Sequence, residues 1–197
     1  MTETATTPQP AANRKILLDT NIISRLEGNL GEKLLVVIGE VIKIGYDIAI
    51  SDMTYMELLT GVDSKMEEKI ANTLRGVDHY LVSTEVLIAS AHIASLYKEL
   101  YDLKQFEIGD RIIAGTAAMN NAIIFTLNGR HYPPPFFKEV DRRRLEYENR
   151  GMPVCSYGYF MEPQMDVINE SHNKRLGIGA PKKEVLELQP KTVISSD

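Results

Sequence analysis

Short apolar runs alternate with longer segments of helical spacing along most of the chain. Residues 15–18 form an apolar run that ends at Asp19, and a helix-compatible segment follows at 21–27. Apolar side chains then recur every three or four residues between positions 34 and 42, and a second compact apolar run occupies 47–50. This order predicts a strand, a helical region and a second strand parallel to the first.

The same alternation continues after this first unit. Ser51 is a residue type that caps helices, and Ser64 and Glu67 have the spacing of a capping box. In chain order, the further elements expected are a helix through Glu57 to Leu59 with a stop at Gly61, a short helix from Ser64, a strand at 79–82, a helix from 86 to about 103, a helix from Asp110, a strand at 122–126, a charged helix at 136–150 after three prolines, and a strand at 153–156. Strands that alternate with helices favour an α/β fold whose parallel sheet is covered on both faces.

The two ends of the chain differ in composition from the middle. Residues 1–13 are rich in Thr, Ala and Pro and lack a basic start followed by an apolar run, so we expect a flexible leader and no signal peptide. The sequence becomes polar and aperiodic beyond about Pro163, which predicts a single domain at 14–162 and a C-terminal extension at 163–197. The longest apolar stretches, such as 34–38, are far shorter than the roughly 20 residues of a membrane-spanning helix, so no membrane partner is expected.

The charge balance excludes a generally basic surface for nucleic acid. The 197 residues include 22 Lys and Arg against 27 Asp and Glu, which gives a net charge of -5 at pH 7. A polyanion would therefore have to be contacted through a local basic patch or a bound metal ion.

Two other kinds of chemistry are disfavoured. Cys155 is the single cysteine, so no intramolecular disulfide can form, and a reducing cytoplasm is the expected location. No His or other base lies near Cys155 in the sequence to activate its thiol. The glycines are scattered, and no Gly-rich loop with a following Lys occurs, which excludes a nucleoside triphosphatase of the phosphate-loop type.

Three acids lie where strands of the predicted sheet end. Asp19 ends the first strand, Glu57 lies on the helix after the second, and Asp110 opens the helix before the 122–126 strand. Ligands bind outside the carboxyl ends of strands in open parallel sheets. Carboxylates that converge there repel one another unless a divalent cation lies between them. Taken singly, each acid is equally explained as a helix cap or a solvated helix residue.

Three segments follow one another in a specific order. They are Leu-Leu-Asp-Thr-Asn at 17–21, the stretch 51–57 followed by Leu-Leu-Thr-Gly at 58–61, and Asp110 with Ile-Ile-Ala at 112–114 and Ile-Phe-Thr-Leu-Asn at 124–128. Together they resemble the motifs of the PIN-domain family, and in particular of VapC-type ribonuclease toxins. The likeness covers roughly residues 15–161, and the segment around Asp19 is its most specific part.

This resemblance implies a compact three-layer α/β/α sandwich with a central parallel sheet. It also implies a metal-dependent endoribonuclease that cuts single-stranded RNA. It assigns the binding of Mg²⁺ or Mn²⁺ to Asp19, Glu57 and Asp110, and a polar supporting role to Asn21 and Thr126. An antitoxin protein is an implied partner, and a homodimer stays open.

One position departs from the family pattern. The family often has a further acid just after the strand that ends at Thr126, and here that place is taken by Asn128. Asn128 can accept a hydrogen bond or hold a water on a metal, but it adds no negative charge. It is therefore kept as a candidate catalytic residue, and the number of metal ions stays open.

Other residues near these segments each have two interpretations. Glu107 either joins the acids or complements the dipole of the helix that follows it, and Asp141 either replaces the missing acid or pairs with neighbouring bases. His131 either assists at the phosphate or lies on the surface beside Tyr132. Candidates for phosphate contacts are Arg111, Arg130 and the triplet 142–144, which alternatively forms a solvated helix face paired with Glu139 and Glu146. Candidates for base stacking, or for an apolar packing corner, are Tyr132, Phe136 and Phe137.

Two classes of function follow. The first is an RNA endonuclease, such as the toxin of a toxin and antitoxin pair. The second is a catalytically weak or inactive PIN-like module that binds RNA or protein. The three acids favour the enzyme, whereas Asn128 and the polar extension favour the module.

Overall fold

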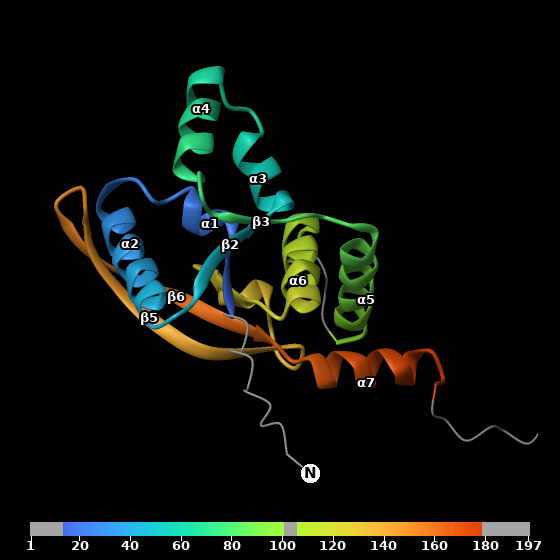
Figure 1. The fold of residues 1–197 in the computed structure, drawn as a ribbon. Coiled ribbons are helices and arrows are strands. Elements are labelled where there is room, and N and C mark those ends of the chain that lie inside the picture. Colours follow the sequence, from blue (N-terminus) through green and yellow to red (C-terminus); the bar gives the residue numbers. More distant parts are fainter. Residues whose placement is uncertain (1–13, 101–105, 179–197) are drawn as a thin grey trace, which may run out of the picture.

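A six-stranded sheet forms the centre of the computed structural model, which describes residues 14–100 and 106–178 (Figure 1). In chain order, its elements are β1 (Lys15–Leu18), α1 (Thr20–Ile23), α2 (Gly28–Lys43), β2 (Asp47–Ser51), α3 (Asp52–Leu59), α4 (Ser64–Thr73), β3 (Asp78–Tyr80), α5 (Thr84–Leu100), α6 (Ile108–Asn120), β4 (Ile123–Thr126), the 3₁₀ turn η2 (Gly129–His131), β5 (Phe137–Asn149), β6 (Met152–Pro163) and α7 (Met165–Arg175).

The sheet is mixed, with its parallel part at one side. The strand order is β3-β2-β1-β4-β6-β5. The first four strands of this order pair in parallel, whereas β6 runs antiparallel to both β4 and β5. The predicted α/β class is confirmed, and the antiparallel hairpin of β5 and β6 extends the parallel sheet.

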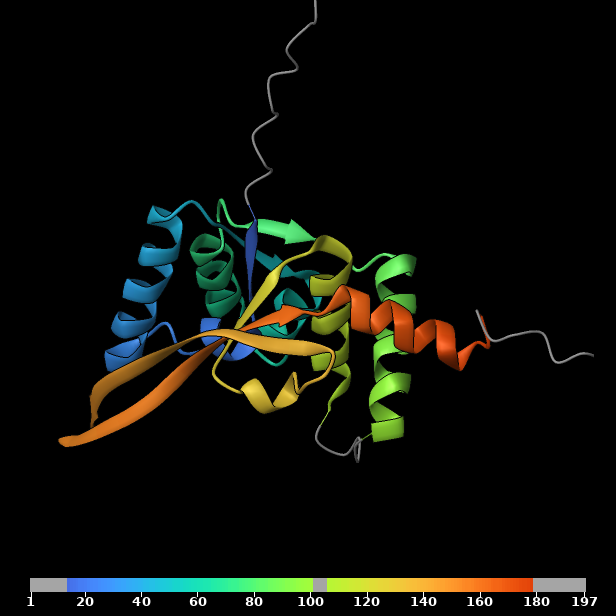
Figure 2. The ribbon, with the colours of Figure 1, turned by 90° about the horizontal axis from the view of Figure 1, so that it is seen from below.

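Side chains of β1 alternate between two apolar layers. Leu17 packs into the core beneath α5 and α6, whereas Ile16 and Leu18 pack into the core beneath α2. Figures 1 and 2 show α2 on one side of the sheet and α5 and α6 on the other. The period of two along the strand therefore builds the three layers of the expected sandwich.

The helices after β2 begin close to their predicted starts. The hydroxyl of Ser51 accepts a 3.2 Å hydrogen bond from the backbone N–H of Met53 and so caps α3, as predicted. Helix α4 begins at Ser64, but its cap is Asp63, whose carboxylate accepts a 2.8 Å hydrogen bond from the Met66 N–H. Short capping patterns are thus correct to within a residue or two.

The prediction of a charged helix at 136–150 is wrong. The segment forms β5, which pairs with β6 from Phe137 opposite Pro163 to Asn149 opposite Met152. Hydrogen bonds to a partner strand outweigh the local helix preference of its charged residues. The strands turn through Arg150 and Gly151, which both have the positive φ that a two-residue hairpin turn requires. The strand predicted at 153–156 is one part of the longer β6.

The segment after Pro163 contains a helix that the polar composition did not predict. Ile168 of α7 is buried in the core, and the rings of His172 and His92 stack at 3.9 Å, so α7 packs against α5. The expected leader at 1–13, the end of the helix predicted to reach about 103, and residues 179–197 of the expected extension lie outside the described residues. None of the helices within 14–100 and 106–178 combines the length and the apolar character needed to span a bilayer.

Candidate active site

Asp19 lies at the carboxyl end of β1 and is only 3% exposed. Its backbone N–H donates a 3.0 Å hydrogen bond to the carbonyl of Phe125, so the ends of β1 and β4 are fixed side by side. Burial raises the pKa of the Asp19 carboxyl to about 6, and the negative charge of Asp110 acts in the same direction. The hydrogen bond from Thr126 opposes this shift but does not cancel it.

A polar network holds one oxygen of this carboxylate. The Thr126 hydroxyl donates to Oδ2 of Asp19 at 2.6 Å, and Nδ2 of Asn21 donates to the same oxygen at 2.7 Å. Oδ1 of Asn21 in turn accepts a 2.8 Å hydrogen bond from the N–H of Leu127. Asn21 and Thr126 therefore orient Asp19, which agrees with the supporting role that the sequence implied for them.

Glu57 reaches the same region from α3. Its carboxylate is half-buried and accepts a hydrogen bond from the hydroxyl of Thr20, the neighbour of Asp19. The Glu57 side chain packs against Gly109, where an added Cβ would clash with the carboxylate. Gly109 directly precedes Asp110, so the first turn of α6 approaches Glu57 closely.

Asp110 interacts with the loop that follows β4. Its Oδ1 lies 2.9 Å from Nδ1 of His131, and the Asp110 side chain is 12% exposed. This contact is the main cause that raises the pKa of His131 above its ordinary value. On the other side of the ring, Nε2 of His131 lies 2.6 Å from Nδ2 of Asn128. The interpretation of His131 as a surface residue is therefore wrong, because its half-buried ring connects Asp110 to Asn128.

The hydroxyl of Tyr132 lies near all three acids. Tyr132 is completely buried, and its hydroxyl has no hydrogen-bond partner within the described part of the chain. Burial raises the pKa of Tyr132 well above its ordinary value, and the charges of Asp19, Asp110 and Glu57 add to the shift. The charges of all three predicted acids thus act on one buried phenol.

The donors in this region match the preference of Mg²⁺ and Mn²⁺. Both ions favour hard oxygen ligands, and Asp19, Glu57 and Asp110 offer carboxylate oxygens. As their side chains stand, no three His, Cys, Asp or Glu residues within 14–100 and 106–178 are placed to hold a metal ion. The hydroxyl of Tyr132 is a buried polar atom that a bound water would satisfy. The donor set and this hydroxyl together fit a hydrated cation.

Two other candidate acids lie outside this group. The side chain of Glu107 is exposed, and its backbone N–H donates a 3.2 Å hydrogen bond to Oδ2 of Asp110, which is a capping contact at the start of α6. Asp141 pairs with Arg143 at 2.7 Å, so its interpretation as a partner of neighbouring bases is confirmed.

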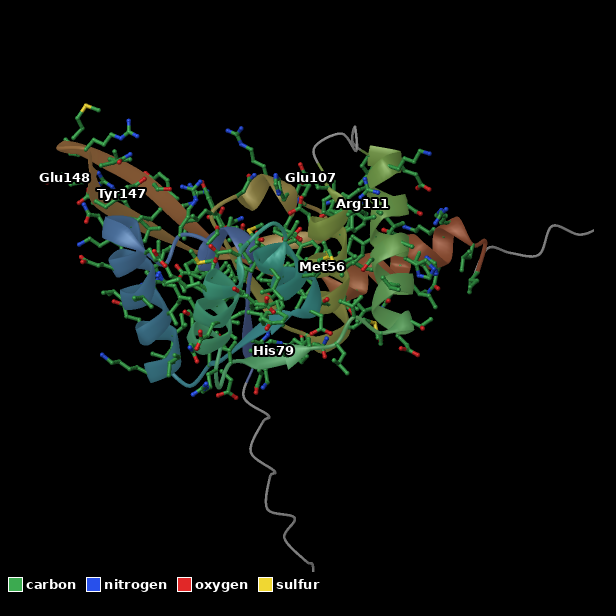
Figure 3. The ribbon with its side chains drawn as sticks, turned by 90° about the horizontal axis from the view of Figure 1, so that it is seen from above. Met56, His79, Glu107, Arg111, Tyr147 and Glu148 are labelled. Carbon is green, nitrogen blue, oxygen red and sulfur yellow. The ribbon has the colours of Figure 1, made fainter. Side chains whose placement is uncertain are left out.

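Some of the cationic and aromatic candidates have contacts within the protein, and others are exposed. The Arg111 guanidinium donates to the carbonyl of Phe106 at 2.8 Å, and Figure 3 shows Arg111 and Glu107 at the same end of α6. Phe136 and Phe137 are buried, which confirms the apolar packing corner. Arg130 is exposed, and the arginines at 142–144 lie on β5 and not on a helix face.

Two contacts to the acids have no signal in the sequence. Thr20 was not singled out, because a hydroxyl beside Asp19 does not reveal that it contacts a helix 37 residues away. Tyr132 was considered only as a stacking or packing residue, since nothing in its neighbourhood shows that it is buried where the charges of the acids act on it. Both relationships arise only when the chain folds and brings distant segments together.

Comparisons with known proteins indicate the family of the chain. A family model described as the PIN domain matches residues 16–141, which is more than half of the chain. Ribonuclease VapC19 from Mycobacterium tuberculosis is 29% identical over 118 residues, which cover 59% of this chain and 91% of the relative.

Two solved structures are more distant. The VapBC2 complex from Rickettsia felis, bound to a DNA fragment from its promoter, has 18% identity and a TM-score of 0.48, with 59% of this chain and 89% of that chain covered. A toxin-antitoxin complex from Klebsiella pneumoniae has 22% identity and a TM-score of 0.48, with 60% and 91% covered. On the strength of the family model, the chain belongs to the PIN domain family.

Proposed function

We propose that this protein is a metal-dependent endoribonuclease that hydrolyses single-stranded RNA, with Asp19, Glu57 and Asp110 as ligands of Mg²⁺ or Mn²⁺. The relationship to a protein named as a ribonuclease supports the class of reaction. The observation that carries the proposal is the buried carboxylate of Asp19, which Asn21 and Thr126 hold at the end of β1 and whose raised pKa is consistent with its burial. A buried carboxylate beside other acids favours the binding of a cation. The positive charge lowers the free-energy cost of burying the ionised carboxylate, and it lowers the repulsion between the acids.

The residues of the chain divide the work at this site. When bound, a divalent cation makes a water more acidic and offsets charge on the phosphoryl oxygens. Asn21 and Thr126 keep Oδ2 of Asp19 in place, and the ring of Tyr132 excludes bulk water from beneath the carboxylates. His131 lies 2.9 Å from Asp110, and once Asp110 binds the cation, the charged ring would have a proton available to an oxygen of the phosphate.

A cleavage assay tests the proposal. Purified wild type, Asp19→Asn and Asp166→Asn are incubated with single-stranded RNA in Mn²⁺, in Mg²⁺ and in chelator, and circular dichroism confirms the fold of each. Asp166 lies exposed in the first turn of α7, so its variant is a matched control for the change of charge. We expect cleavage by wild type and Asp166→Asn only with metal, and none by Asp19→Asn. Equal cleavage by wild type and Asp19→Asn would contradict the proposal.

The second candidate function is a PIN-like binding module without turnover. Asn128 in place of an acid favours it, because the site has one charge fewer to hold metal. Folded wild type that binds RNA but cleaves none with either metal would support the module.

A biological role as the toxin of a toxin-antitoxin pair extends the first proposal. It rests on the resemblance to VapC-type toxins. A small antitoxin gene adjacent to the coding sequence, whose product co-purifies with this protein and suppresses cleavage, is the expected finding.

A further inference from the structure

One face of the β5-β6 hairpin is packed, and the other is exposed. Leu145 and Tyr147 lie on the face that packs against the core beneath α2, and Arg143 forms an ion pair with Glu40 of α2 on the same side. Residues opposite each other in an antiparallel pair share a face. The opposite face of the hairpin therefore carries the pairs Arg142 with Tyr159 and Arg144 with Tyr157. Figure 2 shows the hairpin extending past the end of β4 on the side of α2, away from the helices α5 and α6.

Arginine and tyrosine side chains form a continuous layer on this exposed face. The guanidinium of Arg142 lies 5.1 Å from the ring centre of Tyr159 and 5.8 Å from that of Tyr157. Gly129 packs closely against the Tyr159 ring, because a Cβ added at Gly129 would lie 3.0 Å from Cγ of Tyr159. Tyr157 is 39% exposed and the Arg142 side chain is 50% exposed, so planar surfaces of both face solvent.

A hollow of about 1160 Å³ connects this layer to the candidate active site. Asn128 and His131 line this hollow together with Arg142 and Tyr159. The three acids do not line the hollow, but His131 does, and it contacts Asp110. Ligand pockets commonly measure roughly 300 to 1,000 Å³, so this hollow has room for more than one nucleotide.

The charge of the hollow is opposite to that of the whole chain. Its lining includes the cations Arg130, Lys138 and Arg142 and a single carboxylate, Glu139, although the net charge of the chain is -5. Arg142 is paired with Glu139 at 2.8 Å, whereas Arg130 and Lys138 form no ion pair with the described residues. Lys138 lies opposite Glu162, on the other face of the hairpin from Arg142 and Tyr159, so Arg130 is the cation available for phosphate groups in this hollow.

We propose that the hollow and the exposed hairpin face form a subsite for the bases of single-stranded RNA, continuous with the candidate active site. Bases stack on Arg142 and Tyr157, and Arg130 contacts the phosphates that lead to the acids. Aromatic rings and guanidinium planes bind unstacked bases, so the surface selects single strands over duplex. The family model ends at residue 141, so Arg142, Tyr157 and Tyr159 lie outside the matched region. The subsite rests on the proposed function for its substrate class, but its residues are separate from the acids.

Equilibrium binding to the full chain tests the subsite. The parent is Asp19→Asn in chelator, and the probe is a fluorescein-labelled single-stranded RNA of about 12 nucleotides, a length in the range that stacking surfaces cover. Tyr157→Ala and Arg142→Ala are each expected to raise the Kd about fivefold or more, since loss of a stacked base costs roughly 1 kcal/mol or more. Tyr157→Phe keeps the ring and is expected to bind like the parent. Arg142→Lys keeps the charge but not the plane, so it is expected to preserve the salt dependence and still weaken binding.

Three controls make the result specific. Arg175 on α7 is similarly exposed at 40% and is paired with Glu99 of α5, so Arg175→Ala is the matched control and is expected to leave the Kd unchanged. An abasic strand of the same length is expected to bind weakly and to be insensitive to Tyr157→Ala, because no base is left to stack. An RNA duplex is expected to bind more weakly than the single strand.

The outcomes separate the subsite from the proposed function. If Tyr157→Ala and Arg142→Ala bind within about twofold of the parent, or if the duplex binds as well as the single strand, the subsite is wrong, whatever wild type cleaves. If both variants lose binding while wild type cleaves no RNA, the subsite is supported and the endonuclease is contradicted.

Discussion

The hydroxyl of Thr126 donates a 2.6 Å hydrogen bond to the carboxylate of Asp19, although 107 residues separate the two in the sequence. The bond crosses from the end of β4 to the end of β1, and Asn21 closes the network by donating to both side chains. A buried carboxylate is costly unless it is hydrogen-bonded or paired. The fold therefore buries an acid at the end of the sheet and holds it there by hydrogen bonds.

The first prediction compares Asp19→Asn with Asn128→Ala. Asn at position 19 keeps the shape and hydrogen-bond acceptor of Asp but removes its charge, so we expect cleavage to fall on the order of a thousandfold or more. Asn128 is neutral and contacts His131, so its loss is expected to cost about 1 kcal/mol, or roughly fivefold in rate. Single-turnover cleavage rates with Mn²⁺ measure both. A larger loss for Asn128→Ala than for Asp19→Asn would contradict the assignment of the ligand.

The second prediction concerns the stability of the metal-free protein. Because the pKa of Asp19 is raised to about 6 in the folded state, from an ordinary value of 3.8, the native state binds this proton more tightly than the unfolded state. The resulting stabilisation is fully present at low pH and is lost as pH rises through about 6. Between pH 5 and pH 8, wild type should lose on the order of 1 kcal/mol more stability than Asp19→Asn. Urea unfolding in chelator measures this difference, and parallel pH profiles would refute it.

The third prediction concerns His131. Its pKa is raised by Asp110, so the charged ring persists above the ordinary value of 6.5 and competes with a cation for the Asp110 carboxylate. His131→Ala is therefore expected to tighten Mn²⁺ binding at pH 6.5 by roughly fivefold, and less at pH 8.5, where a smaller share of the wild-type rings is charged. Calorimetric titration at both pH values provides the measurement. Weaker Mn²⁺ binding at both would show instead that His131 holds Asp110 in the position that the metal needs.

The fourth prediction tests how the hairpin joins the core. Gly158 is buried in β6, and a Cβ added there would lie 2.6 Å from the ring of Phe125, which stacks on Phe160 at 4.4 Å. Gly158→Ala is expected to lower the free energy of unfolding by about 1 to 3 kcal/mol through overpacking. Gly39→Ala on α2 meets nothing within 4 Å and is expected to stabilise the protein slightly. Thermal unfolding that ranks Gly158→Ala at or above wild type would contradict the packing.

The parallel part of the sheet was predictable from sequence because its signals are local. The run at 15–18 ends at Asp19 in the structure as in the pattern, and β4 lies within the run predicted at 122–126. Ser51 caps its helix through contacts within two residues. Where a residue's partners lie next to it in the chain, residue type and spacing are sufficient.

The hairpin and the contacts of the acids were not predictable in this way. Arg142 and Glu139 form an ion pair three residues apart, a spacing that also suits a helix surface, so the charged segment has no strand signal of its own. Its identity as a strand comes from β6. Likewise, Asp110 and His131 meet only because the loop after β4 folds back on α6. Non-local contacts of this kind are set by the fold and not by local pattern.

The position of Mn²⁺ in the folded protein is the most direct measurement of the shared metal site. Crystals of wild type grown with Mn²⁺ would be examined by anomalous scattering, with Asp19→Asn crystals as the control. We expect an anomalous peak within coordination distance of carboxylates of Asp19, Glu57 and Asp110, with Asp110 released from His131, and no peak there in Asp19→Asn. A wild-type structure at saturating Mn²⁺ in which Asp110 stays paired with His131, Glu57 stays bonded to Thr20 and no peak lies near Asp19 would contradict the metal site.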